Sequence, residues 1–418
     1  MKHSQRVDAA GESRHRGLAG LWARHGQWIL WLVVVHATAT AVLRLLPAFE
    51  ALMFVPQAAI DLLIRHDEVT RWFGGEWIYG DAHSANYPPG TYVLLWPLMG
   101  WLPLDSMRVL YGVTTGLTLL VISFVAVRAS GAERLAEKAF MLVFVLPLGA
   151  TQITVWIGQL GLHVTAALLG AAALLLGPRL SSPAKASWQT DLGAALLLVF
   201  SLVKPTLAVP VVAAVLVVTR RWRPALLTGV LYLGVTAVAA AFQEGSAVAL
   251  VREWLGREEI MNLPLGSVNI YLWLHWAGFE GSMVPFSLVI LAAFVAWAWW
   301  QRRVDPLLVL AVGAVVARLW VHHRAFDDVL LVVLAIALLR MARVPTGVPD
   351  AVRVVAASLL AAIYLLGHAP WHFLSGESPT LWLITELGRT VAWLAAFVLL
   401  IWHVHRRKTY PAPALATG

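Results

Sequence analysis

Long apolar stretches alternate with short polar or basic intervals along the whole chain. Twelve of these stretches approach the length of a membrane-crossing helix, which takes about 20 apolar residues. They lie at 27–47, 106–127, 139–157, 160–177, 191–203, 205–219, 224–242, 282–300, 304–321, 327–342, 351–369 and 381–403. The pattern predicts an all-α polytopic membrane protein with about 12 transmembrane helices. These helices form a single domain over 27–403, between a basic tail at 1–26 and a second tail at 404–418.

The basic residues predict which helix ends face the cytoplasm. Most of the 31 Lys and Arg residues fall in the two tails and in alternate loops, in clusters such as Arg220-Arg221-Trp222-Arg223. Cytoplasmic loops of membrane proteins carry an excess of Lys and Arg. Both termini are therefore predicted to be cytoplasmic. Two long segments, at 48–105 and 243–276, are predicted to lie on the outer side.

A short apolar run inside the first outer segment is predicted not to cross the membrane. Residues 91–103 are too few for a span and contain Pro97 and Gly100. If this run crossed, every later basic cluster would change side. We therefore expect a re-entrant or interfacial helix, with the consecutive prolines Pro88 and Pro89 fixing the backbone at its start.

A break in the helices is predicted at Lys204-Pro205, between two short apolar stretches. Proline removes a backbone donor and disfavours helix in the residue before it. A lysine at such a break is costly in a membrane unless an anionic group pairs with it. The alternative is that Lys204 extends to the outer headgroups and stays solvated there.

Composition supports lipid as the solvent of this chain. Hydrophobic residues make up 60% and charged residues 13%, whereas a soluble domain has about 25% charged residues. The net charge of +8 would also suit a nucleic-acid partner, but the basic residues lie in short clusters between apolar stretches, which is the pattern of membrane topology. No nucleic-acid partner is expected. The chain has no cysteine, which excludes disulfides and thiolate metal sites.

Polar chemistry is predicted on the outer face, where most of the 23 acidic residues fall. The first outer segment supplies carboxylates, and the cationic candidates come from the helix break and a late cluster. The carboxylates are Asp61, Asp67, Glu68, Glu76 and Asp81, and the cationic groups are Lys204, His322, His323 and Arg324. A carboxylate can take the proton of an attacking hydroxyl while cations stabilise a departing phosphate. The apolar helices would hold the lipid tail of such a donor.

Two other interpretations use the same residues. Asp61, His66, Asp67 and His322-His323 offer metal ligands, but they show no fixed metal-binding spacing, so no tightly bound metal is expected. Transporters also have broken helices and intramembrane charges, but their sites lie near the midplane. Here only Glu386 and Arg389 fall well inside an apolar stretch, and their separation of one turn predicts an ion pair.

Several motifs in order resemble glycosyltransferase family 87 of the C superfamily, which includes polyprenol-phosphate-mannose-dependent alpha-mannosyltransferases. They are Asp61, Gly74-Gly75, Tyr79, Asn86-Tyr87-Pro88-Pro89, the apolar run from Pro97 to Pro103, Gly158-Gln159, Lys204-Pro205-Thr206, Arg220-Arg221-Trp222-Arg223, Asn269, and His322-His323 with Phe326-Asp327. Asp67-Glu68 also resembles the acidic pair of the protein O-mannosyltransferases. Asp67 therefore stays the second candidate for the base.

This resemblance implies a glycosyltransferase C-type fold and an inverting, metal- and cofactor-independent enzyme of the inner (plasma) membrane, with its active site on the outer side. It would move a sugar, with a mannose-like hexose favoured, from a polyprenyl-phosphate donor to a glycolipid or glycan hydroxyl. Asp61 is the implied base with His322 as a second catalytic residue, and Lys204, His323 and Arg324 would bind the donor phosphate. Tyr87, Gln159 and Asn269 are candidates for the sugar and acceptor, although each of them has a plainer role at a helix end.

Overall fold

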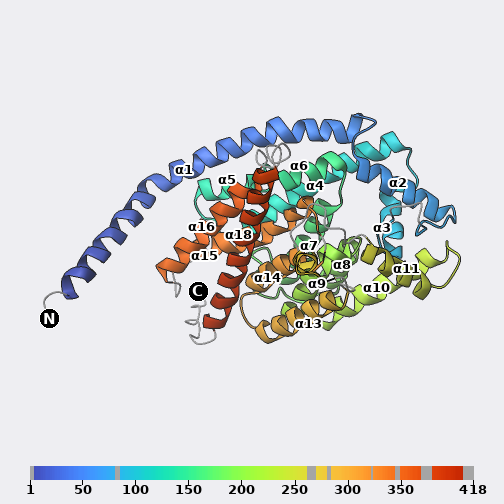
Figure 1. Ribbon diagram of the computed structural model, residues 1–418. Coiled ribbons are helices and arrows are strands. Elements are labelled where there is room, and N and C mark those ends of the chain that lie inside the picture. Colours follow the sequence, from blue (N-terminus) through green and yellow to red (C-terminus); the bar gives the residue numbers. More distant parts are fainter. Residues whose placement is uncertain are drawn as a thin grey trace.

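The computed structural model is helical throughout the residues it describes, which are 4–80, 85–260, 270–279, 284–321, 323–343, 349–368 and 379–407. The first nine helices are α1 (Ser4–Phe54), α2 (Ile60–Phe73), α3 (Pro89–Met99), α4 (Leu104–Ala129), α5 (Leu135–Val143), α6 (Gly149–Ile157), α7 (Gly161–Leu176), α8 (Trp188–Ser201) and α9 (Pro205–Thr219). The others are α10 (Trp222–Ala240), α11 (Ala247–Ile260), α12 (Ile270–Trp276), α13 (Val284–Gln301), α14 (Pro306–Leu319), the 3-10 helix η1 (Ala325–Leu331), α15 (Val332–Arg343), α16 (Asp350–Gly367) and α18 (Pro379–Arg407). Helix α1 follows one edge of the molecule, and α18 crosses its face (Figure 1).

Six helices in the described ranges are long and apolar enough to cross a membrane. They contain Gly26–Phe54, Leu104–Ala129, Trp222–Ala240, Val284–Gln301, Asp350–Gly367 and Ile384–Arg406. The bent pair α6 and α7 would make a seventh if it counts as one span. The other predicted stretches are helical but shorter than the about 20 residues that a span takes. The membrane character is therefore supported, whereas the count of twelve spans is not confirmed.

Two predicted boundaries were wrong. Residues 139–157 are not one helix, because α5 ends at Val143 and α6 begins at Gly149, with Pro147 between them. Helix α1 does not stop near residue 47 but continues to Phe54 with Pro47 inside it. The buried Arg108 side chain donates to the backbone oxygens of Ala51 and Leu52 at 2.8 Å each. Carbonyls at the end of a helix lack some of their intrahelical partners, and here Arg108 bonds to Leu52 and adds a second donor to Ala51, which also accepts from the N–H of Val55 at 3.2 Å.

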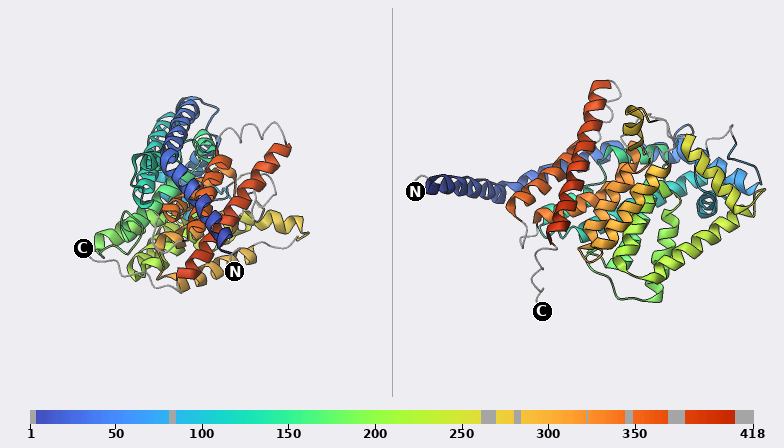
Figure 2. Two further views of the ribbon diagram at one scale, coloured as in Figure 1. Left: turned by 90° about the vertical axis from the view of Figure 1, so that its left-hand side faces the viewer. Right: turned by 60° about the horizontal axis from the view of Figure 1, so that its bottom comes forward.

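The interior consists of helices that are apolar on every side. All residues of α14 from Pro306 to Arg318 are buried, and α7 and α15 are buried along most of their lengths. Helices α10 and α13 lie at the periphery and expose large apolar side chains, such as Leu233 at 70% and Val289 at 68%. The right-hand view of Figure 2 shows α10 at the rim of the helical body, and Figure 1 shows α13 at its lower edge. Exposed apolar surface of this extent is the surface that lipid covers.

The breaks predicted from proline are present. Helix α3 begins at Pro89 after an extended Pro88, and its 11 residues are too short to cross a bilayer. Helix α8 ends at Ser201 and α9 begins at Pro205, so Lys204 stands at the N-terminal end of α9. The hydroxyl of Thr91 donates to the backbone oxygen of Val203 at 3.0 Å. This hydrogen bond connects the start of α3 to the break between α8 and α9.

A sharp bend at Gly158 positions α2 against α6. Gly158 has a φ of 73° and ends α6, and α7 departs at 116° to it. A Cβ at Gly158 would lie 2.5 Å from the Cβ of Leu62, so the close approach of α2 requires glycine. On the same side, the backbone N–H of Ala59 donates to the oxygen of Trp156 at 3.2 Å.

Replacing Gly158 by alanine is expected to destabilise the protein and displace α2. The left-handed backbone costs a non-glycine residue about 1–2 kcal/mol, and the overlap with Leu62 adds about 1–3 kcal/mol. The unfolding temperature in detergent measures the loss. Gly131→Ala is the control, because Gly131 has a φ of +67° but open space around its Cβ position. Equal losses in the two variants would contradict the packing explanation.

Candidate functional site

Asp61 lies in the first turn of α2, which is anchored from both ends. Its start is held by the Ala59 bond to Trp156, and the indole N–H of Trp72 donates to the oxygen of Ala239 at 3.0 Å. The Trp72 ring also stacks on Tyr92 of α3, with centroids 4.5 Å apart. Asp61 itself is partly exposed. The helix therefore fixes the position of the carboxylate while leaving it accessible.

Gln159 connects Asp61 to Lys204. Its amide nitrogen donates to Oδ2 of Asp61 at 2.5 Å, and its amide oxygen accepts from Nζ of Lys204 at 3.4 Å. This orientation uses the amide correctly, since the NH₂ group faces a carboxylate and the oxygen faces an ammonium. Gln159 directly follows the bend at Gly158, so the turn that ends α6 also presents the bridging side chain.

Lys204 forms a close ion pair with Asp327 of η1. Nζ of Lys204 lies 2.5 Å from Oδ1 of Asp327 and 4.7 Å from the centre of the Phe326 ring. Burial alone would lower the pKa of Lys204, but the facing Asp327 carboxylate outweighs it and raises that pKa. Burial would likewise raise the pKa of Asp327, yet Lys204 and His323 hold it well below its usual range. Both shifts favour the ionised pair, and the Lys204 side chain, only 11% exposed, lies against Asp327.

His323 and Arg324 lie on the η1 side of this pair. Nδ1 of His323 is 3.1 Å from Oδ2 of Asp327, and the ring is only 1% exposed. Burial lowers the pKa of His323 more than Asp327 raises it, so a neutral ring donates to the carboxylate. The backbone N–H of Arg324 donates to the same oxygen at 3.3 Å, and its side chain is exposed. His323 therefore contacts Asp327 from a buried position, and its predicted contact with the donor phosphate stays a prediction.

Tyr87 lies on the other side of Gln159. Its hydroxyl is 3.5 Å from Oε1 of Gln159, and its backbone oxygen accepts from the hydroxyl of Tyr79 at 2.6 Å. The guanidinium of Arg65, one turn after Asp61 on α2, lies over the Tyr87 ring at 4.4 Å from its centre. Arg65 in turn forms an ion pair with Glu68. Tyr87 is thus clamped between the helix that carries Asp61 and the bridge to Lys204.

One predicted site residue lies away from this cluster, and two lie outside the described residues. Asp67 points away from it, with its side chain 57% exposed and paired with Arg71 at 2.8 Å. His322 and Asn269 lie outside the described residues. Sequence reasoning assigned no role to Asp327 or Arg65, although Phe326-Asp327 belongs to the motif set, and it named Glu68 only among the candidate carboxylates. The i, i+4, i+7 spacing of Asp61, Arg65 and Glu68 indicated a shared helix face.

Replacing Glu68 by glutamine is expected to change how stability depends on pH. Burial raises the pKa of Glu68 from 4.5 to about 7, because pairing with Arg65 offsets only part of the cost of burying the charge. A carboxyl group whose pKa is raised in the folded state stabilises the fold while it is protonated, which is the case below about pH 4.5. This stabilisation, in total about 3 kcal/mol, is lost as the pH rises through about 7. Unfolding temperatures between pH 5 and 8 should show the variant gaining on the wild type as pH rises. A constant difference would contradict this.

No metal site is evident in the parts of the chain that the structure describes, where no three His, Asp or Glu side chains are grouped closely enough to hold an ion. Within these parts, the cluster consists of two carboxylates and one ammonium, joined by an amide. Such a set can exchange a proton with a ligand hydroxyl and donate to an anionic oxygen.

The fold and cluster define a membrane protein that gathers charged and polar groups at the ends of apolar helices. The model of one family, glycosyltransferase family 87, matches residues 86–339. This match covers more than half of the 418-residue chain, so the chain belongs to that family and is a glycosyltransferase. No curated protein and no solved structure matches it. Tyr87, Gln159, Lys204 and Asp327 lie inside the matched range, and Asp61 precedes it.

Proposed function

We propose that the protein transfers a sugar, a mannose-like hexose, from a polyprenyl-phosphate donor to a hydroxyl of a glycolipid or glycan. The reaction takes place at the outer face of the inner (plasma) membrane and inverts the anomeric configuration. The observation that carries the proposal is the Asp61–Gln159–Lys204 chain of hydrogen bonds. It links a partly exposed carboxylate to a cation, and a group-transfer step from phosphate needs both.

Asp61 is the general base of this step. In the described part of the chain, Gln159 donates only to Oδ2, so Oδ1 can accept the proton of the acceptor hydroxyl. The hydroxyl oxygen then bonds to the anomeric carbon while the bond from that carbon to the phosphate oxygen breaks. The electron pair of the broken bond stays on the polyprenyl phosphate. Direct displacement from the opposite face inverts the configuration.

The departing phosphate is stabilised by Lys204 and by helix ends. An ammonium has three N–H donors, and the described contacts of Lys204 engage two of them, with Asp327 and Gln159. The third can bind a phosphate oxygen. Helices α7 and α9 both begin here, at Gly161 and Pro205, and the positive ends of helix dipoles favour anions. The exposed Arg324 adds a further cation beside them.

A transfer assay tests this function. The purified protein in liposomes receives radiolabelled polyprenyl-phosphate mannose, or the glucose analogue, together with a membrane glycolipid extract as acceptor. Labelled glycolipid formed with EDTA present supports the proposal. A transporter or flippase of a lipid-linked saccharide is the alternative, because broken helices with buried charges also occur in transporters. That protein would move the labelled lipid across the bilayer and form no glycosidic product.

A further inference from the structure

The two consecutive aspartates of η1 face in different directions. Asp327 pairs with Lys204 in the candidate site. Asp328 instead accepts from Nε of Arg318 on α14 at 2.5 Å and from Nη1 of Arg389 on α18 at 3.3 Å. One short segment therefore joins the site to a second, buried set of charges.

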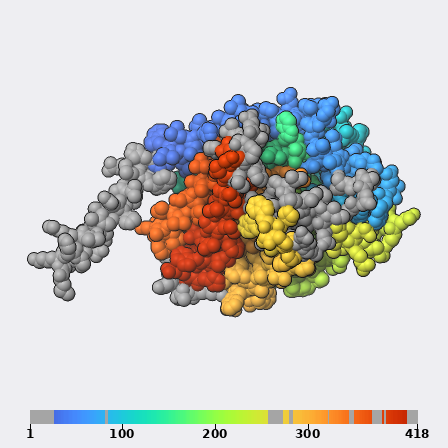
Figure 3. Space-filling view, in the orientation of Figure 1, coloured from blue at the N-terminus to red at the C-terminus, as the bar shows by residue number. Residues whose placement is uncertain are grey.

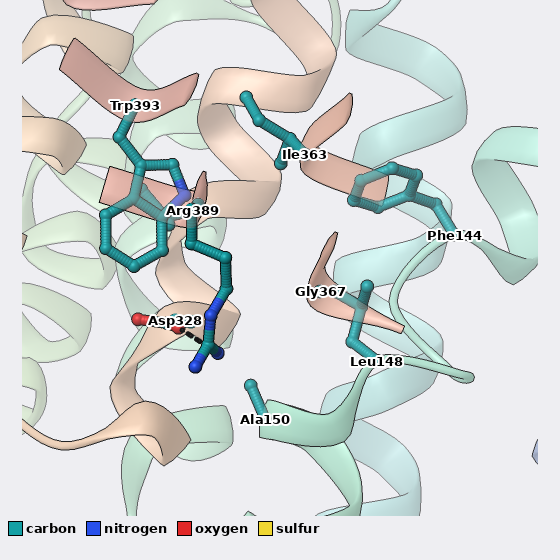
Figure 4. Close-up of a pocket in the computed structure, with 9 residues that line it drawn as sticks. Phe144, Leu148, Ala150, Asp328, Ile363, Gly367, Arg389 and Trp393 are labelled. Carbon is teal, nitrogen blue, oxygen red and sulfur yellow. Dashed lines mark hydrogen bonds and ion pairs between the residues drawn. The ribbon is translucent and has the colours of Figure 1, made fainter. Parts of the chain in front are cut away.

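Two further contacts from α18 complete the buried set of charges around Asp328. Arg389 pairs with Glu386 one turn before it, which confirms the ion pair predicted from their spacing. The ring of Trp393, one turn after Arg389, lies 5.1 Å from the guanidinium carbon of Arg318. Arg318, Asp328 and Arg389 are all at most 8% exposed. Figure 4 shows Arg389 reaching down to Asp328 with Trp393 above it.

The buried helix η1 borders a small cavity on the side of α18. A cavity of about 20 Å³ separates Asp328 and Leu331 of η1 from apolar side chains that include Phe144 and Ile363. That space is enough for about one water molecule. A 3-10 helix has poorer hydrogen-bond geometry than an α-helix, and runs longer than about 3–4 residues are uncommon. The seven residues of η1 are therefore held by the apolar packing of Val329 and Leu330 together with the charged contacts of Asp327 and Asp328.

We propose that Arg389 is a positioning residue, through which α18 holds η1 so that Asp327 stays against Lys204. Helix α18 begins at Pro379 and lies beyond the family match, which ends at residue 339. Its surface runs along the face of the molecule beside α16 (Figure 3). The C-terminal helix thus completes the site from outside the family-matched part of the chain. For catalysis, this role rests on the proposed function.

Arg389→Met tests the role with two readouts. The first is kcat and KM with polyprenyl-phosphate mannose. The second needs no activity: it is the rate at which an amine-reactive reagent labels Lys204, measured by mass spectrometry in detergent relative to the exposed Lys185. Pairing with Asp327 protects the Lys204 amine, so a displaced η1 should expose it. We expect about tenfold faster labelling and about tenfold lower kcat/KM, which is a typical size for coupled neighbours.

Two further variants separate positioning from general destabilisation. Arg389→Lys keeps a charge near Asp328 and should restore most of the protection of Lys204. Arg353→Met removes an ion pair with Asp350 at 3.1 Å on α16, which involves no residue of η1, and should label at the wild-type rate. A folded Arg389→Met protein with wild-type labelling would overturn the proposal.

Two further outcomes also test the proposal. If Arg389→Met does not fold, Glu386→Gln replaces it, since that change removes the carboxylate that orients Arg389, and unchanged labelling there counts against the proposal. If wild-type protein transfers no sugar, the proposed function fails, while the labelling of Lys204 still tests the link from α18 to the site.

Discussion

Replacing Asp61 by asparagine is expected to leave a folded protein that still binds donor but transfers no sugar. Asparagine has nearly the same shape, and its oxygen can still accept from Gln159. It cannot take a proton from the acceptor hydroxyl. General-base groups contribute about 10²–10⁴-fold to a rate, and a loss of that size is expected in kcat. Turnover of labelled donor, together with donor binding measured separately, gives the result.

Asp67→Asn is the matched control on the same helix. Asp67 is exposed and pairs with Arg71, and such surface pairs contribute about 0–1 kcal/mol. This variant should turn over at the wild-type rate. Normal turnover in Asp61→Asn, or a loss confined to Asp67→Asn, would move the base away from Asp61.

Replacing Lys204 by alanine is expected to weaken both donor binding and the fold. Removing one partner of a buried ion pair costs about 3–5 kcal/mol, because the other charge is left without compensation. Here the carboxylate left behind is that of Asp327, whose side chain is 3% exposed. The apparent affinity for donor falls as well, because the cation facing the phosphate is lost. Unfolding temperature and the KM for donor measure the two effects.

The double variant Lys204→Ala with Asp327→Asn separates these effects. A neutral amide at position 327 removes the buried charge, so part of the stability should return while the KM for donor stays raised. An unchanged KM in folded Lys204→Ala protein would remove Lys204 from the donor site. Full recovery of KM in the double variant would show that the ammonium acts only on the fold.

The choice between Asp61 and Asp67 shows what the sequence leaves open. Both precede the same motifs and both lie on α2. Six residues apart on a helix, they face different directions. The sequence does not specify which face packs inward, because that depends on the bend at Gly158 and on Trp72 reaching Ala239. The structure brings Asp61 to Gln159 and leaves Asp67 exposed.

The difference between the twelve predicted spans and the six candidate helices has another cause. An apolar stretch predicts burial, but lipid and protein bury it equally well. Helices α7 and α14 are apolar because other helices surround them, and such helices need no bilayer length. Stretch 139–157 is likewise mostly apolar, yet it divides near Pro147 into α5 and α6.

The sequence by itself determined the helical class, the breaks at Pro89 and Pro205, the short α3 and the family resemblance. These follow from local properties, namely apolar run length, the restricted backbone of proline and the order of motifs. Only the tertiary structure decided that Lys204 pairs with Asp327, 123 residues away, and that Arg389 holds the neighbouring Asp328. Such pairs depend on how the helices pack. The chain as a whole determines that packing, so the pattern of residues within one helix does not predict it.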